Sequence, residues 1–124
     1  MQIYKQKGHN TFLIINHKTL KKVLINDVIL LKGDINYTTI YLQNGREKVV
    51  PHSLKYFEPF LETHGFLRVH RAFLINPNYI KEYNQDEETL TMTNGHEATI
   101  SRRRKHTLKE TSVLCNPTVF SASV

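Results

Sequence analysis

The sequence lacks the features that mark an exported or membrane-bound protein. Cys115 is the only cysteine among 124 residues, which excludes an internal disulfide and favours a reducing compartment. The N-terminus has no apolar stretch typical of signal peptides, and no apolar run approaches the roughly 20 residues that span a bilayer. We therefore expect a cytoplasmic protein with no membrane association, in which the glycosylation sequon at Asn36 is unused.

The sequence also lacks tryptophan and the common spacings of metal-binding residues. Its seven histidines show neither the HxH nor the HExxH pattern, and Cys115 has no evident base near it. We therefore expect no metal, no cofactor and no enzymatic activity. The alternative is a hydrolase in which His70 acts with a distant carboxylate, and metal and activity assays on the pure protein would separate the two.

Basic residues outnumber acidic residues, and their distribution is uneven. The chain has 17 Lys and Arg against 11 Asp and Glu, a net charge of +6 and a pI near 9.5. Four of the acids lie within residues 82–88, whereas residues 102–109 hold five basic residues and no acid. This polarised charge favours a nucleic-acid partner over a membrane surface, because no strongly amphipathic basic helix accompanies it.

Residues 66–76 combine apolar strand residues with three closely spaced basic groups. Alternate side chains of a strand face opposite ways, so we expect Arg68 and His70 to share one face. Arg71 then points the other way or lies where the strand ends. Burying these groups would be costly, which predicts that the polar end reaches water or an acidic partner. The alternative is an ordinary strand with a solvated basic edge.

Ser101 is well placed to cap a helix over residues 102–111. Four consecutive cations would then begin this helix, where the helix dipole favours anions instead. A local rule broken in this way often marks a functional site, and arginines at a helix start suit a phosphate group. The alternative is a solvated run of charge.

The remaining pattern predicts a mainly β protein of one domain. Strands are expected at residues 12–15, 21–24, 28–31, 37–43, 46–50, 79–83, 89–92 and 97–100. The continuous apolarity of residues 28–31 indicates a strand buried on both faces. Asn44-Gly45 and Asn94-Gly95 predict hairpins in which both central residues have positive φ.

A helix is predicted over residues 53–62. Leu54, Phe57 and Leu61 form one apolar stripe, Pro59 should kink or split the helix, and Gly65 should end it.

Six motifs follow one another along the chain. They are Asn26-Asp27-Val28-Ile29, Asn36-Tyr37-Thr38 before Ile40-Tyr41-Leu42, Ser53-Leu54, Phe66-x-Arg68-Val69-His70-Arg71, Asn76, and Ile100-Ser101-Arg102-Arg103. With these motifs in this order, residues 12–111 resemble the LytTR family of bacterial DNA-binding domains. Residues 1–11 and 112–124 are then expected to be an N-terminal extension and a loosely held tail.

The resemblance implies an elongated stack of small antiparallel β-sheets with two short helices, whose loops enter successive major grooves of double-stranded DNA. It implies a sequence-specific transcriptional regulator that binds promoter direct repeats, with a homodimer on DNA as a further expectation. The implied base contacts are Asn36, Arg71 and Arg103. The implied contacts to the DNA backbone are Lys32, His70, Ser101, Arg102, Arg104 and Lys105.

Some features depart from the family's usual pattern. Lys32 stands where relatives often carry an acidic or small residue, and Ile35 places an apolar side chain in the first contact loop. Many relatives carry a phospho-receiver domain before this module, and 124 residues leave no room for one. We therefore expect regulation through expression level, a partner or the chain ends.

A second alternative is a β module that binds single-stranded RNA by base stacking. Tyr37, Tyr41 and Tyr56 could supply the aromatic surface, although tyrosines at such spacings are more often packed in a sheet. Competition between duplex and single-stranded nucleic acid would distinguish this module from a duplex-binding protein.

Overall fold

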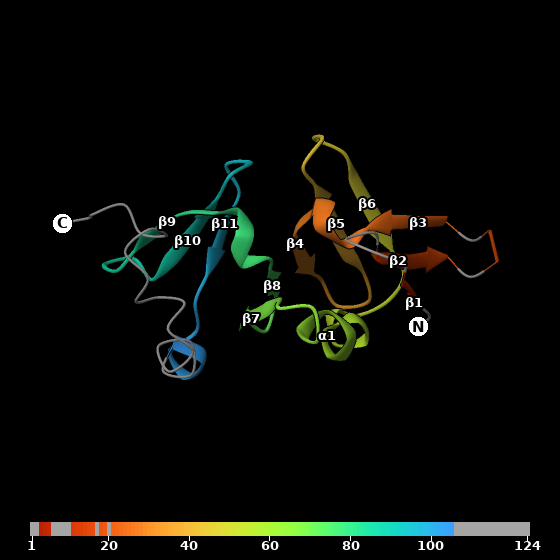
Figure 1. Ribbon diagram of the computed structural model, residues 1–124. Helices are drawn as coiled ribbons and strands as arrows, with labels where there is room; N and C mark the ends of the chain where they lie inside the picture. The colour runs from red at the N-terminus through yellow and green to blue at the C-terminus, as the bar shows by residue number, and fades with distance from the viewer. Residues whose placement is uncertain (1–2, 6–10, 17, 20, 106–124) are drawn as a thin grey trace.

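The computed structural model describes residues 3–5, 11–16, 18–19 and 21–105, and the structural statements below concern these residues. Three small antiparallel sheets lie side by side and give an elongated, mainly β molecule (Figure 1). The fold class predicted from the sequence is confirmed. The tail expected at residues 112–124 and residues 106–111 of the predicted last helix lie outside the described residues.

The sheets follow one another along the chain. The first contains β1 (Ile3–Lys5), β2 (Thr11–Asn16) and β3 (Lys21–Leu24). The middle sheet has the order β6-β5-β4-β8-β7, with bounds Glu47–Val50, Thr38–Leu42, Val28–Gly33, Phe73–Ile75 and Leu67–His70. The third has the order β11-β10-β9, with bounds Glu97–Thr99, Thr89–Met92 and Ile80–Asn84. Two short 3-10 helices, η1 (Ile25–Asp27) and η2 (Pro77–Tyr79), precede β4 and β9.

The middle sheet separates two hydrophobic cores, and β4 contributes to both. Val28 and Leu31 pack in the first core, with the first sheet and the helix α1 (Leu54–Glu62). Ile29 and Leu30 pack in the second core, with the third sheet. A register shift between Val28 and Leu30 explains why two adjacent residues lie on the same side. The prediction that this strand is buried on both faces is confirmed.

The two Asn-Gly hairpins are present, but their turn type differs from the prediction. Gly45 and Gly95 have positive φ (86° and 89°), whereas Asn44 and Asn94 do not. Each glycine N–H donates to a carbonyl three residues earlier, at 3.1 Å and 2.9 Å. The loops are therefore three-residue connections in which only the glycine is left-handed, because a glycine has no Cβ to clash there.

Helix α1 has the predicted apolar stripe. Leu54, Phe57 and Leu61 are buried, together with Phe60. Pro59 lies within the helix but does not split it, because only the carbonyl of Lys55 loses its intrahelical donor and that residue is exposed to water. Gly65 (φ 89°) ends the helix, with its N–H donating to the Glu62 carbonyl at 3.1 Å.

Residues 66–76 form a hairpin, β7 and β8, rather than one strand. Arg68 pairs with Leu74 and His70 pairs with Phe73, with a register shift between the two pairs. Because adjacent residues of β8 face opposite ways, Arg68 and His70 lie on opposite faces, and the prediction that they share one face is wrong. Arg71 lies where β7 ends, which is one of the two places expected.

Asn76 ties the end of β8 to the strand beside it. This buried side chain donates from Nδ2 to the Val28 carbonyl at 3.0 Å. Its Oδ1 accepts from the Asn78 N–H at 3.1 Å and so caps η2. As a result, β9 begins at Ile80, one residue later than predicted.

Candidate nucleic-acid interface

Three connecting segments meet along one side of the row of sheets, and we call them together the basic edge. They are the loop of residues 34–37, the turn Arg71-Ala72, and the helix start at residues 101–105, on the side where α1 lies (Figure 1). The Gly33 N–H donates to the Ala72 carbonyl, and the Ser101 N–H donates to the Val69 carbonyl, both at 2.8 Å. The fold therefore brings together segments that are about thirty residues apart in sequence.

Two shallow hollows along this edge share one arginine. The first is lined by Gly33, Asp34, Ile35, Ser53, Leu54, Lys55, Arg68, Arg71 and Ala72. The second is lined by His70, Arg71, Ser101, Arg103 and Arg104. Arg71 lines both, which places it at the centre of the basic edge.

The loop of residues 34–37, which we call the first loop, presents polar and apolar side chains to solvent. Its backbone is closed by a hydrogen bond from the Asp34 N–H to the Tyr37 carbonyl at 2.7 Å. Asn36 is exposed, and so is Lys32 at the end of β4. Ile35 is 86% exposed, more than any other large apolar side chain in the described part of the chain. The loop can thus offer an amide, a cation and an apolar group to a ligand.

The turn between β7 and β8 leaves Arg71 exposed beside a half-buried His70. The Nδ1 atom of His70 accepts the Ala72 N–H at 3.1 Å. Burial lowers the pKa of His70, and the nearby charges of Arg71, Arg68 and Arg104 lower it further. The neutral ring, accepting at Nδ1, carries its proton on Nε2, which is a suitable donor to an anionic oxygen.

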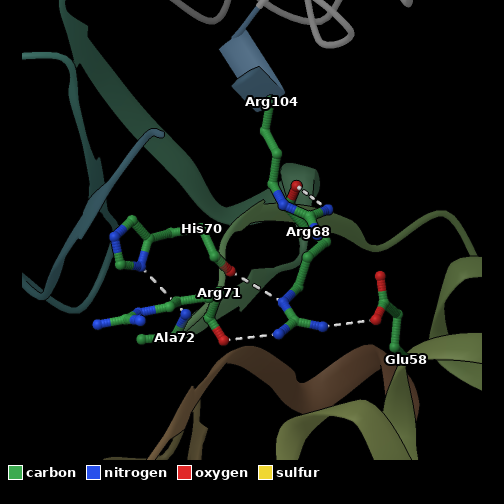
Figure 2. Close-up of polar contacts among 6 residues, drawn as sticks. All are labelled: Glu58, Arg68, His70, Arg71, Ala72 and Arg104. Carbon is green, nitrogen blue, oxygen red and sulfur yellow. Dashed lines mark hydrogen bonds and ion pairs between the residues drawn. The ribbon is translucent and has the colours of Figure 1, made fainter. Parts of the chain in front are cut away.

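Arg68 supports this turn from inside (Figure 2). Its Nε donates to the His70 carbonyl at 2.8 Å, and its Nη2 donates to the Arg71 carbonyl at 2.6 Å. Its Nη1 binds the Glu58 carboxylate of α1 at 2.5 Å. The acidic partner expected for the basic segment is therefore a residue of the same chain.

The start of the last helix is capped as predicted. The Arg104 N–H donates to the Ser101 Oγ at 3.3 Å, and the Lys105 N–H donates to the Ser101 carbonyl at 2.9 Å. Arg102 and Arg103 are exposed and project from the first turn. The cations expected at this helix start are therefore accessible at its first two positions.

The next two cations have partners within the protein. Arg104 is half-buried, and its Nη1 donates to the Arg68 carbonyl at 3.5 Å. Lys105 binds Glu88 at 3.0 Å, and the hydrogen bond that Lys105 donates to this carboxylate raises the pKa of Lys105. Arg104 and Lys105 therefore differ from Arg102 and Arg103, which the sequence did not distinguish.

All nine residues predicted to contact DNA lie on or beside the basic edge. They are Lys32, Asn36, His70, Arg71, Ser101, Arg102, Arg103, Arg104 and Lys105. The sequence analysis did not single out Glu58 or Glu88. Their partners lie ten and seventeen positions away, and no local sequence pattern indicates such pairs.

Neither a metal site nor a membrane span is found in the described part of the chain. Its side chains include no group of three or more His, Cys, Asp or Glu that could hold a metal ion. Within the same residues, no helix is long and apolar enough to cross a membrane.

These features define a class of β-rich modules that present basic loops and a basic helix start on one edge. The family model of the LytTr DNA-binding domain matches residues 18–112. The chain therefore belongs to the LytTR family, whose members are DNA-binding regulator domains and not enzymes.

One solved structure gives the same result. It is described as the LytTr DNA-binding domain of a methyl-accepting/DNA response regulator from Bacillus cereus. It is 27% identical and superposes with a TM-score of 0.63, covering 73% of this chain and 84% of that chain. A search of curated protein sequences found no match.

Proposed function

We propose that this DNA-binding domain reads a specific sequence in double-stranded DNA by placing its loops in successive major grooves. The observation that carries the proposal is the convergence of the first loop, the β7–β8 turn and the last helix start on one edge, with the exposed Arg71 between two hollows. An arginine can bind guanine O6 and N7 together, and an asparagine can bind the adenine edge. We assign base contacts to Arg71, Arg103 and Asn36.

The other residues of the edge are assigned to the DNA backbone. Arg102 and Lys32 are exposed cations, and His70 and Ser101 can donate to phosphate oxygens. We give Arg104 and Lys105 smaller shares, because each already has a partner within the protein. Residues 12–111 would form the binding domain, with residues 112–124 outside it. Of the N-terminal extension expected at residues 1–11, β1 pairs with β2 and so belongs to the first sheet. We further propose a cytoplasmic regulator that binds promoter direct repeats as two copies.

A stacking surface for single-stranded RNA has less support. Tyr37 lies in the first loop, Tyr41 in β5 and Tyr56 in α1, so the three rings belong to different elements. Tyr41 packs against the second core and the His96 ring, and Tyr56 stacks on His52. No shared platform for successive bases follows from these contacts.

The test begins with selection of binding sites from random duplex DNA, followed by affinity measurements on the selected duplex and a scrambled one. If about five to seven phosphates are contacted, log K should fall with log salt with a slope of about −4.5 to −6. Arg71→Ala should weaken binding to the selected duplex by about 1–3 kcal/mol, and weaken binding to the scrambled duplex much less.

Arg46→Ala is a matched control, because Arg46 is an exposed arginine in the β5–β6 hairpin. It should leave both affinities unchanged. Equal losses of affinity for the two duplexes in Arg71→Ala would show that Arg71 contacts only phosphate and does not read a base. A salt slope near zero, or a preference for the unpaired strand, would refute duplex binding through the basic edge.

A further inference from the structure

Arg68 of β7 differs from the exposed arginines of the basic edge, Arg71, Arg102 and Arg103, because its guanidinium is turned inward. Its side chain is 10% exposed, and that of its partner Glu58 is 20% exposed. Figure 2 shows the guanidinium between the helix α1 and the turn that carries Arg71. This group lines the first hollow but is much less accessible to DNA than the exposed Arg71.

The acceptors of Arg68 show what it holds. The carbonyls of His70 and Arg71 are consecutive in the turn, and the same planar guanidinium binds both, at 2.8 Å and 2.6 Å. A rigid fork that binds two successive carbonyls fixes the orientation of their peptide planes. Those planes set the direction in which the Arg71 side chain leaves the backbone.

Glu58 fixes the fork in turn. The carboxylate binds Nη1 of Arg68 at 2.5 Å and belongs to α1, which packs in the first core through Phe57 and Leu61. The register shift at Val69 places the Arg68 side chain on the face toward this helix and the His70 side chain on the other face. A continuous line of contacts therefore runs from the first core to the Arg71 backbone.

We propose that Arg68 and Glu58 are positioning residues that determine DNA specificity by aiming Arg71 at its base. This inference rests on the proposed function, in which Arg71 reads a base. Without the pair, Arg71 keeps its charge and exposure and still attracts phosphates. It loses the fixed pose that a bidentate base contact requires. Removal of the pair should therefore lower the preference for the selected duplex over the scrambled one, with little loss of affinity for the scrambled duplex.

The experiment compares Arg68→Lys and Glu58→Gln with the wild-type full chain on the selected and scrambled duplexes. Lysine keeps the positive charge but cannot hold two carbonyls and a carboxylate in one plane. Arg68→Lys should lower the ratio of the two affinities about tenfold, within the range that one bidentate base contact supplies. Glu58→Gln keeps an acceptor without the charge and should lower the ratio about twofold to threefold.

A double variant separates positioning from general support of the fold. In the Arg71→Ala background, Arg68→Lys should not lower the ratio any further, because no base contact remains to be aimed. An equal loss on both duplexes in both backgrounds would show that Arg68 only stabilises the fold. If Arg68→Lys does not fold by circular dichroism, Glu58→Gln with and without Arg71→Ala carries the same test.

Glu88→Gln is the matched control, because it breaks the other ion pair of this region without touching the turn. It should leave the ratio unchanged and strengthen binding to both duplexes, since it removes a negative charge beside Lys105. If Arg71→Ala lowers the ratio but Arg68→Lys and Glu58→Gln do not, the positioning role alone is refuted. If Arg71→Ala leaves the ratio unchanged, base reading by Arg71 is refuted, and the positioning role with it.

Discussion

The basic edge and the opposite edge of the molecule build their turns in different ways. The opposite edge consists of the β5–β6 and β10–β11 hairpins, which we call the hairpin edge (Figure 1). Each of its loops closes on itself: Asn44 Oδ1 accepts the Arg46 N–H at 2.9 Å, and Asn94 Oδ1 accepts the His96 N–H at 3.0 Å. The Arg71 turn also has a local bond, from the Ala72 N–H to His70 Nδ1. Its carbonyls, however, are held by the Gly33 N–H of β4 and by Arg68, which is bound in turn to Glu58 of α1.

The two edges also differ in how their charged residues are distributed. The hairpin edge alternates basic and acidic groups, with Arg46 beside Glu47 and His96 beside Glu97. Exposed charges on the basic edge are mostly cations, with Asp34 as the acid of its first loop, and Glu58 of the neighbouring helix α1 is partly buried under Arg68. A turn that must present a charged group in one pose thus depends on distant residues, whereas a turn that only reverses the chain needs a local glycine.

The sharpest way to test this difference is to add a Cβ to a glycine on each edge. A Cβ at Gly33 would lie 2.9 Å from Leu54 Cβ, so Gly33→Ala must separate α1 from the first loop. We expect it to cost about 1–3 kcal/mol of unfolding free energy, and to weaken binding to the selected duplex.

Gly45→Ala is the matched change on the hairpin edge. Gly45 has φ 86° and open space around it, so alanine should cost about 1–2 kcal/mol through backbone strain alone. DNA affinity should be unaffected. Denaturant unfolding and duplex titration measure both quantities, and an equal effect of the two variants on DNA binding would contradict the division between the edges.

Arg102→Ala tests the charge difference. Arg102 is exposed at the helix start, and loss of one phosphate contact should flatten the salt slope by about 0.9. At about 0.15 M salt this corresponds to a loss of about fivefold on both duplexes. Arg46→Ala should not change the slope. A slope that is unchanged by Arg102→Ala would remove Arg102 from the phosphate contacts.

Ile35 provides a smaller and more specific test of the basic edge. We propose that this exposed side chain contacts a thymine methyl group, the apolar feature of the major groove. Replacing thymines of the selected site by uracil, one at a time, should weaken wild-type binding at one position by about fourfold, the value of one buried methyl group. The same replacement should have no effect on Ile35→Ala. Equal losses for both proteins would exclude the contact.

The smallest expected effect is a pH dependence that comes from the turn. The pKa of His70 is lowered in the folded protein, so the unfolded chain binds more protons there. Stability from this group is complete above the unfolded pKa of about 6.5 and is lost as the pH falls below it and through the lower pKa of the folded protein. His70→Asn keeps an acceptor for the Ala72 N–H and does not titrate. It should lose less stability between about pH 7.5 and pH 5 than the wild type in denaturant unfolding; identical losses would show that His70 does not contribute.

The sequence predicts best those parts of the molecule that are encoded locally. The hairpins at Gly45 and Gly95 and the apolar stripe of α1 were predicted, because glycine and helical periodicity act within a few residues. The turn at Arg71-Ala72 has no glycine, proline or asparagine, so it was read as part of one strand. Because of the register shift at Val69, Arg68 lies on the opposite face from His70, whereas strict alternation predicts that they share one face.

For the candidate site too, the sequence predicts the local features but not the contacts between distant residues. The basic segments stand out in the sequence, and the resemblance supplied the order in which they meet. The internal partners of Arg68 and Lys105 depend on the folded chain, so no reading of either segment alone could supply them. The individual DNA contacts stay predictions until binding is measured.

The position of β4 between the two cores has a consequence for how the molecule opens. Ile29 and Leu30 face one core, Val28 and Leu31 face the other, and the strand continues directly into the first loop of the basic edge. A strand that is shared by both cores couples the two parts of the molecule that are built around them. Neither part can unfold without exposing apolar residues of the other core. The slowest amide hydrogen exchange should therefore fall in β4, and bound DNA should slow exchange in both halves together.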